Sequence, residues 1–356
     1  MSWKSVALYS TIIVATLVGA EAVARIIDWR ATTFQGAAGD GFGADRYYHS
    51  WSGAGDLVPN QDGHWVIWFH RPYHVQTNSL GLRSTEEPLD KAFRIYAIGD
   101  SQTFGPYLAN EDTWPGWTQN YLRQRYRDAD RVQVFNAGIA GYTLSDEIAL
   151  LREKAIDFKP SLVLLAVFEN DLFDLRDVNG QRPSNDARSR LKILLKSLTR
   201  ESALFSIVNK IKIRMQFAAA QIDIRRGEGA TTSPADPTPD SQHLVDSYSE
   251  LYGQAVKLLT SNGIPLAVIF IPARHTMESE SLMQTVIERL TRESGTPFLD
   301  LTPILRTNSN YSERFYLMQR EPGGGFSGNG HLSREGGEQV GLAVADWLFA
   351  QNLIPQ

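Results

Sequence analysis

Four short segments of the sequence carry chemical groups that together could transfer an acyl group. Gly-Asp-Ser at 99–101 supplies the hydroxyl of Ser101. The later segments "NAGIAGYT", "FEND" and "GHLSREG" supply the N–H of Gly141, the amide of Asn170 and the imidazole of His331. Acyl transfer requires a nucleophile, a base and donors for a developing oxyanion. Gly, Asp and Ser are also ordinary turn formers, so this segment alone leaves Ser101 open as a turn residue.

The elements that must position these groups are predicted by apolar runs that alternate with helical patterns from Phe93 onward. Near-continuous apolar strands separated by helices indicate a parallel sheet covered on both faces. The expected strands are "RIYAI" (94–98), "VQVF" (132–135), "LVLLAVF" (162–168), "LAVIFI" (266–271) and "FLDL" (298–301). Helices are expected over parts of 113–127, 145–157, 241–261, 277–294 and 334–351. Ligands of such sheets lie outside the carboxyl ends of the strands. We therefore expect the four groups at one edge of the sheet, with His331 in a Gly-rich loop.

The four segments, in this order, resemble the SGNH hydrolases, also called the GDSL esterase/lipase family. "GDS" matches the family's first block, "NAGIAGYT" its second, "FEND" its third and "GHLSREG" its fifth, and the resemblance covers about residues 93–351. It implies a flavodoxin-like three-layer α/β/α fold with a mainly parallel five-stranded sheet, and no metal or organic cofactor. It also implies that Ser101 is the nucleophile and His331 the base. The Ser101 N–H, the Gly141 N–H and the Asn170 side chain would form the oxyanion hole.

The sequence departs from the family pattern at two places. Phe168 stands where the third block usually has glycine, which could narrow the site beside Asn170. The family's third catalytic acid normally precedes the histidine by three residues, and Gly328 occupies that position here. Another carboxylate could orient His331, with Glu321 as the candidate. Alternatively, a Ser–His dyad works alone, or activity has been lost.

The N-terminal residues 1–30 predict a signal anchor or a signal peptide. An apolar run follows Lys4 and continues to Ala20, where Glu21 interrupts it. A terminal position, a preceding Lys and few polar side chains favour membrane targeting over a buried core helix. We expect an uncleaved anchor in the inner membrane with a periplasmic catalytic domain; the alternative is a cleaved signal and a secreted protein.

The rest of the chain divides into an N-terminal arm at 31–90 and a hydrolase domain at 91–356. In the arm, "HWVIWFHRPYHV" predicts a strand or hairpin, and "TNSLGLRS" has the chemistry of a turn. The domain contains a helical insertion at about 175–240, whose polar positions are mostly basic. It would form a lid on the core or lie on an anionic membrane surface.

Composition excludes several functions. The chain of 356 residues has a formal charge of −5, which argues against nucleic acid as a partner, and no cysteine, which excludes thiolate catalysis and disulfides. The histidines of the arm indicate packing rather than a metal site. The expected function is an exported or membrane-anchored serine esterase for an O-acyl ester, such as an acetyl ester, of a glycan or small alcohol. The alternatives are O-acyl transfer to a polysaccharide and a non-catalytic glycan-binding protein.

Overall fold

The computed structural model describes most of the hydrolase domain and the N-terminal helix. The described residues are 3–35, 57, 59–60, 62–65, 73–126, 129–172, 175, 204, 239–274, 276–277, 279, 281–307, 314–320 and 326–356. The chain divides into two compact units, one of Met1–Ser50, Gly63–Tyr73 and Pro183–Thr231, the other of Trp51–Asp62, His74–Arg182 and Thr232–Gln356. The predicted insertion at 175–240 lies outside the described residues, apart from Leu175, Leu204 and the first turn of the helix that begins at Pro239.

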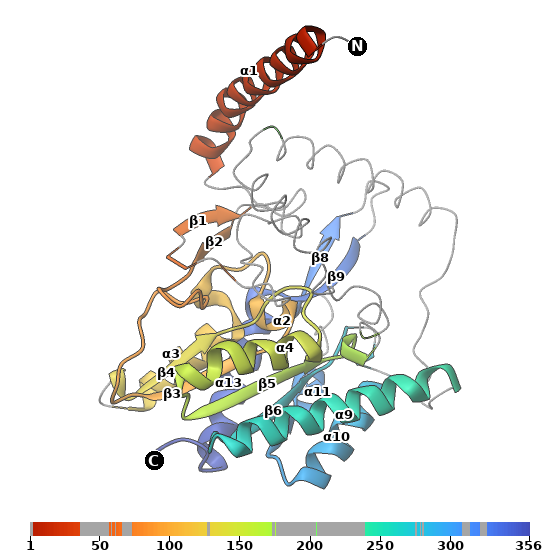
Figure 1. Ribbon diagram of the computed structural model, residues 1–356. Coiled ribbons are helices and arrows are strands. Elements are labelled where there is room, and N and C mark those ends of the chain that lie inside the picture. The colour runs from red at the N-terminus through yellow and green to blue at the C-terminus, as the bar shows by residue number, and fades with distance from the viewer. Residues whose placement is uncertain are drawn as a thin grey trace. The chain divides into compact units, whose positions relative to one another are not determined.

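The elements follow the chain in the order labelled in Figure 1. The strands are β1 (Asp62–Trp65), β2 (Tyr73–Gln76), β3 (Phe93–Ile98), β4 (Val132–Asn136), β5 (Leu162–Phe168), β6 (Leu266–Ile271), β7 (Phe298–Asp300), β8 (Tyr316–Arg320) and β9 (Phe326–Leu332). The α-helices are α1 (Trp3–Gln35), α2 (Ser101–Phe104), α3 (Trp114–Arg125), α4 (Leu144–Leu150), α5 (Ile156–Phe158), α9 (Pro239–Ser261), α10 (Leu282–Ser294), α11 (Thr302–Arg306) and α13 (Arg334–Ala350). Short 3₁₀ turns lie at Asn110–Asp112 and Ala129–Arg131, and a π-helical stretch at Leu151–Ala155 joins α4 to α5.

The central sheet has five strands in the order β4-β3-β5-β6-β7, and every neighbouring pair is parallel. All five strands coincide with the apolar runs that the sequence marks as strands. Counted along the chain, the order is 2-1-3-4-5, which is the order of flavodoxin-like doubly wound sheets. The predicted fold class is therefore confirmed, and ligands of such a sheet lie beyond the carboxyl ends of its strands.

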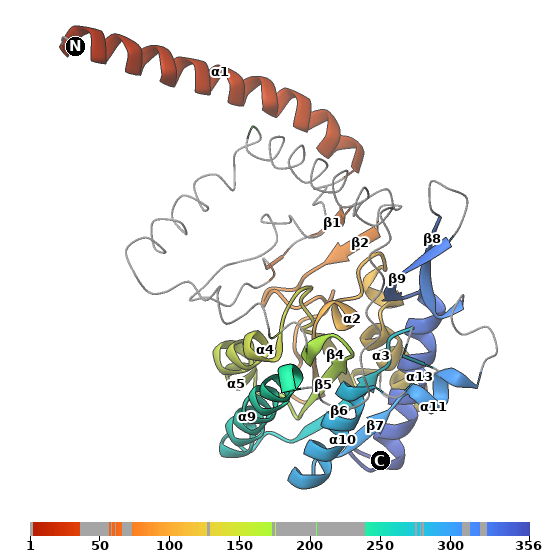
Figure 2. The same cartoon turned by 90° about the vertical axis from the view of Figure 1, so that its right-hand side faces the viewer.

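Helices cover both faces of this sheet because its strands are apolar on both sides (Figure 2). Ile95 and Ala97 of β3 belong to the core cluster that contains α3 and α13 residues, whereas the alternate residue Tyr96 packs with Phe158 of α5, ring centroids 5.3 Å apart. Successive side chains of a strand point to opposite faces. A fully apolar strand therefore requires a helical layer on each side.

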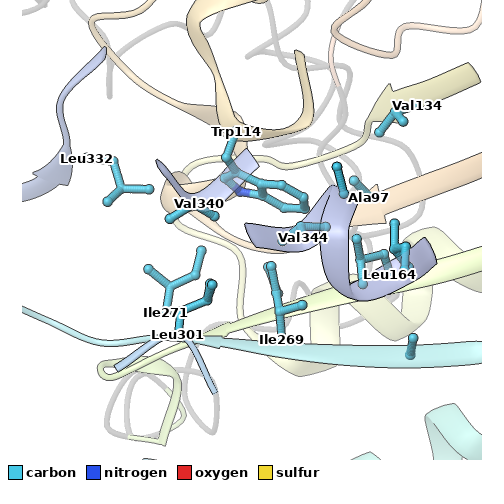
Figure 3. Close-up of a cluster of buried hydrophobic side chains, with 14 of the residues drawn as sticks. Ala97, Trp114, Val134, Leu164, Ile269, Ile271, Leu301, Leu332, Val340 and Val344 are labelled. Atoms are coloured by element: carbon cyan, nitrogen blue, oxygen red, sulfur yellow. The ribbon is translucent and has the colours of Figure 1, made fainter. Parts of the chain in front are cut away.

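The larger cluster lies between the sheet and the pair α3 and α13 (Figure 3). Trp114 of α3 is 1% exposed and lies beside Val340 and Val344 of α13. The two helices approach closely at Gly341, where a Cβ atom would lie 2.9 Å from the backbone nitrogen of Thr118. This contact fixes α13, whose first turn follows directly after β9 and its histidine.

The first unit contains α1, a single helix that extends beyond the expected segment of 1–30. Its residues Trp3–Ile26 are long and apolar enough to cross a membrane, and the hydroxyl of Thr16 donates to the carbonyl of Ile12 at 2.8 Å. Glu21, which interrupts the apolar run, forms an ion pair with Arg25 at 2.9 Å. Thr16 and Glu21 therefore have partners within the helix, and Oε2 of Glu21 also accepts the N–H of Leu204 at 3.1 Å.

Candidate active site

Ser101 begins α2 directly after the first strand of the central sheet. The carboxylate of Asp100 caps this helix: its Oδ1 accepts the Gln102 N–H at 2.8 Å, and the Ser101 hydroxyl lies 3.4 Å from its Oδ2. Gly99 precedes them because a Cβ atom there would lie 2.9 Å from the carbonyl oxygen of Ala166. The sharp junction between strand and helix thus presents the Ser101 hydroxyl at the carboxyl edge of the sheet.

His331 lies at that same edge, although it is separated from the serine by most of the domain. Its Nε2 is 3.0 Å from the Ser101 Oγ across a sequence separation of 230 residues. Both side chains are partly exposed. The sequence predicted a Gly-rich loop here, but the residue lies in β9 of the antiparallel β8–β9 hairpin. At this distance the imidazole can take the proton of the hydroxyl.

The backbone around Ser101 restricts which N–H groups can bind an oxyanion. In lipase-type hydrolases the residue after the nucleophile supplies one such N–H. Here the N–H of Gln102 is bonded to Asp100. The N–H of Ser101 lies in the first turn of α2, where the helix offers it no acceptor. The first turn of α2 therefore leaves the Ser101 N–H, rather than that of Gln102, able to bind an oxygen atom beside the Ser101 hydroxyl.

The loop after β4 carries Gly141 along the same edge. The N–H of Ile139 donates to the carbonyl of Gly99 at 3.1 Å, and the Asn136 amide donates to the carbonyl of Thr103 at 2.7 Å. These bonds connect the loop to Gly99 and to α2. Gly141 is exposed and has a φ of +81°, a conformation that glycine adopts without strain.

Asn170 follows β5, the strand next to β3, and two buried carboxylates hold the turn that contains it. Oδ2 of Asp171 accepts the Phe168 N–H at 3.1 Å, and Oε2 of Glu169 accepts the hydroxyl of Ser281. Burial raises the pKa of Glu169 above its ordinary value, against the opposing effect of the Ser281 hydrogen bond. Phe168 itself belongs to the buried core cluster. The structure thus holds Asn170, partly exposed, at the end of a strand adjacent to the serine's strand.

The third acid of the predicted site is not located by the structure. Glu321 lies outside the described residues, and Gly328 and Asn329 lie in β9. Asp300 ends β7 and its Oδ1 accepts the Thr302 N–H at 2.9 Å. Asp300 therefore lies in the turn that leads into α11.

Tyr107 is a neighbour of the histidine that the sequence analysis missed. Its ring lies edge-on to the His331 ring, with centroids 6.0 Å apart. Its φ of +71° is a left-handed conformation that costs a bulky residue energy. Only the composition of the "FGPY" segment hints at an unusual turn.

Arg83, also missed, is buried beneath this loop. Its Nη1 donates to the carbonyl of Gly105 at 2.8 Å, and the same guanidinium contacts the carbonyls of Phe104 and Leu108. Arg83 lies in the predicted turn "TNSLGLRS", in which Gly81 has a left-handed conformation. An arginine within a turn-like segment gives no sequence signal of such burial.

Glu147 is a buried carboxyl group near Asp100, and the family resemblance assigns it no role. Glu147 of α4 is 2% exposed, and burial, with the nearby charges of Asp100 and Asp146, raises its pKa well above the ordinary value. Burial also raises the pKa of Tyr248 of α9, with the carboxylates of Asp171 and Glu147 adding to the effect.

Among the described residues, no group of three or more His, Asp or Glu side chains could hold a metal ion.

The comparisons with known proteins agree with this fold. The family model of the GDSL-like Lipase/Acylhydrolase family matches residues 97–338, more than half of the chain. None of the curated proteins compared with the chain matches it in sequence.

Several solved structures have a similar fold at low identity. A putative lipolytic protein of the G-D-S-L family from Desulfitobacterium hafniense DCB-2 is 17% identical, with a TM-score of 0.40 over 72% of this chain and 99% of that one. The lipase/acylhydrolase from Enterococcus faecalis is 14% identical, with a TM-score of 0.41 over 72% and 96% of the two chains. Axe2, an acetylxylan esterase from Geobacillus stearothermophilus, is 14% identical, with a TM-score of 0.40 over 73% and 96%. The family model spans the domain from β3 to the first turn of α13, and the chain therefore belongs to the GDSL-like lipase/acylhydrolase family.

Proposed function

We propose that the protein is a serine esterase in which Ser101 attacks the acyl carbon of an ester and His331 moves the proton. The observation that carries this proposal is the 3.0 Å separation of Ser101 Oγ and His331 Nε2 in a chain of this hydrolase family. A serine activated by a hydrogen-bonded histidine is the arrangement of nucleophilic acyl transfer.

In the first half-reaction, the Ser101 oxygen forms a bond to the carbonyl carbon while its proton passes to His331 Nε2. The carbonyl oxygen becomes an oxyanion, which the N–H groups of Ser101 and Gly141 and the amide of Asn170 would stabilise. The tetrahedral intermediate then collapses. Its bond to the alkoxy oxygen breaks, and the His331 imidazolium gives the proton to the departing alcohol.

The second half-reaction regenerates the enzyme. His331 takes a proton from water, whose oxygen attacks the acyl-Ser101 carbon. The resulting intermediate expels the Ser101 oxygen, which regains a proton from His331 as the acid is released. With a sugar hydroxyl in place of water, the same steps would transfer the acyl group, so the acceptor alone separates hydrolase from transferase.

The substrate we propose is a short O-acyl ester, such as an acetyl ester, of a glycan or small alcohol. Phe168 stands where the family usually has glycine, and its side chain is buried in the core cluster at the start of the turn that presents Asn170. Tyr107 lies beside His331, which protonates the alcohol, so its ring would border the leaving group. Rates on p-nitrophenyl esters from acetate to octanoate test the acyl length, and a peak at octanoate would contradict it.

We also propose that α1 anchors the protein in the inner membrane with its catalytic unit in the periplasm. The 24 residues Trp3–Ile26 rise about 1.5 Å each, enough for a hydrocarbon core of about 30 Å. The apolar side chains are exposed, as at Val18 with 64% of its surface accessible. N-terminal sequencing of the mature protein in its native membrane tests retention, because a cleaved signal would remove Met1 and the residues after it.

The enzymatic proposal is tested with the full chain in detergent and p-nitrophenyl acetate as substrate. We expect Ser101→Ala to remove at least 99% of turnover, while Ser145→Ala on α4 retains it. A Ser101→Ala protein with more than a few percent of the parent's rate would show that Ser101 is not the nucleophile. A folded parent without turnover would instead favour the non-catalytic binding protein.

A further inference from the structure

The side chain of Gln102 joins the nucleophile helix to the backbone on both sides of His331. Its Nε2 donates to the carbonyl of Gly330 at 2.9 Å, and its Oε1 accepts the N–H of Leu332 at 3.3 Å. Gln102 is 3% exposed. The residue next to the proposed nucleophile therefore holds the two residues that flank the proposed base.

The amide of Gln102 binds one backbone group on each side of His331. These groups lie in an irregular part of β9, where Gly330 has a φ of +81° and the pairing with β8 shifts register. A primary amide offers both the donor and the acceptor that these two groups require. Because both flanks of His331 are held, the direction in which its side chain leaves the backbone is held too.

The backbone of Gln102 is fixed independently of this bridge. Its N–H donates to Asp100 Oδ1 at 2.8 Å within the cap of α2. Leu332 belongs to the core cluster, so the far end of the bridge is also anchored. Between two fixed ends, the amide sets the distance from the Ser101 helix to β9.

We propose that Gln102 is a positioning residue that keeps His331 in register with Ser101, and that proton transfer between them depends on its amide. This inference rests on the proposed esterase function. A misplacement of about 1 Å in an active site can lower the rate by about 100-fold. Loss of the bridge should therefore appear in kcat, because substrate binding does not use the Gln102 amide.

The chain offers a matched control in Gln133 of β4. Gln133 is 1% exposed, and its amide also bridges backbone groups: it donates to the carbonyl of Glu87 at 3.0 Å and accepts the N–H of Leu89 at 2.8 Å. In the described part of the chain, the Gln133 side chain hydrogen-bonds to Glu86, Glu87 and Leu89, and none of these bonds involves Ser101 or His331. Methionine at either position keeps the side-chain length and removes all hydrogen bonds of the amide, which at Gln133 include a third bond, to the carboxylate of Glu86 at 3.1 Å.

The experiment compares Gln102→Met, Gln102→Glu and Gln133→Met in the full chain, using p-nitrophenyl acetate and the thermal midpoint of unfolding. We expect both methionine variants to unfold at a lower temperature, but only Gln102→Met to lose kcat, by about 10- to 100-fold with an unchanged KM. Gln102→Glu can accept the Leu332 N–H, but it can donate to Gly330 only while its carboxyl is protonated, so its kcat should fall, relative to the parent's, as the pH rises.

Three outcomes would overturn the role of Gln102: a parental kcat in Gln102→Met, an equal loss of kcat in Gln133→Met, or a loss confined to KM. If Gln102→Met does not fold, a kcat of Gln102→Glu that matches the parent's at every pH from 5 to 10 overturns it. Failure of the proposed function is a different result. In that case the parent itself neither hydrolyses the ester nor depends on Ser101.

Discussion

The guanidinium of Arg83 lies over the ring of Phe104, with its Cζ 4.7 Å from the ring centroid, and the same group donates to the carbonyl of Gly105 at 2.8 Å. Arg83, which precedes the first strand of the central sheet, thus packs against α2 and binds the backbone at its C-terminal end.

Replacement of Arg83 by methionine should destabilise the catalytic unit. Each buried carbonyl that loses its donor costs about 1–3 kcal/mol, so a total of roughly 3 kcal/mol is expected. For a domain of this size that lowers the thermal midpoint by about 6–12 °C. The control is Arg94→Met, since Arg94 also lies over a ring, that of Phe158 at 5.3 Å, but is more exposed. Equal midpoints for the two variants would contradict the role of Arg83.

Glu147 should make stability depend on pH. Its folded-state pKa is raised above the ordinary value of 4.5 by burial and by the charges of Asp100 and Asp146. The folded state therefore holds the proton more tightly than the unfolded state does. The contribution of the Glu147 proton to the free energy of unfolding is fully present below about pH 4.5, and it is lost as the pH rises through the raised pKa.

Glu147→Gln keeps the shape of the protonated carboxyl and cannot ionise. We expect its thermal midpoint to match the parent's near pH 4.5 and to exceed it at pH 8. The exposed Glu153 of the same helical stretch provides the control, as Glu153→Gln. If the thermal midpoints of Glu147→Gln and the parent differ by the same amount at both pH values, Glu147 is not the source of the pH dependence.

Asn170→Ala removes a proposed oxyanion donor. One such donor contributes about 10²–10³ in turnover, so kcat should fall by that factor with little change in KM or in the thermal midpoint. Asn170→Asp, which keeps the size but offers no donor when ionised, should be at least as slow. A change confined to KM would mean that Asn170 only binds substrate.

The sequence located the strands well and the surroundings of the site less well. Continuous apolar runs leave few alternatives to buried parallel strands, and all five strands lie where they were expected. Within the range 277–294, where a helix was expected, α10 begins at Leu282, because the Ser281 side chain accepts the Gln284 N–H and caps the helix there. His331 was expected in a loop because "GGGFSGNG" has no alternating pattern, and its pairing with β8 is a tertiary contact. The bridge of Gln102 joins residues 228 positions apart, which a linear pattern does not reveal.

The identity of the third acid is tested with Glu321→Gln. If Glu321 orients His331, its loss should lower kcat by up to about 10⁴. The histidine would also lose an anionic partner that raises its pKa, so the acidic limb of the kcat/KM profile should move to lower pH. Adding Gly328→Asp, at the family's usual spacing, should restore part of the rate. A Glu321→Gln protein with the parent's kcat and pH profile would instead support a Ser–His dyad.

The central claim is that Ser101 is a nucleophile activated by His331, and covalent labelling tests it most directly. The full chain is treated with a p-nitrophenyl alkylphosphonate, p-nitrophenol release is counted, and the labelled peptide is identified by mass spectrometry. We expect one equivalent released per chain, a single phosphonyl group on Ser101, no label in Ser101→Ala and much slower labelling in His331→Ala. A label on another residue, or no label in a protein that still hydrolyses p-nitrophenyl acetate, would contradict the account.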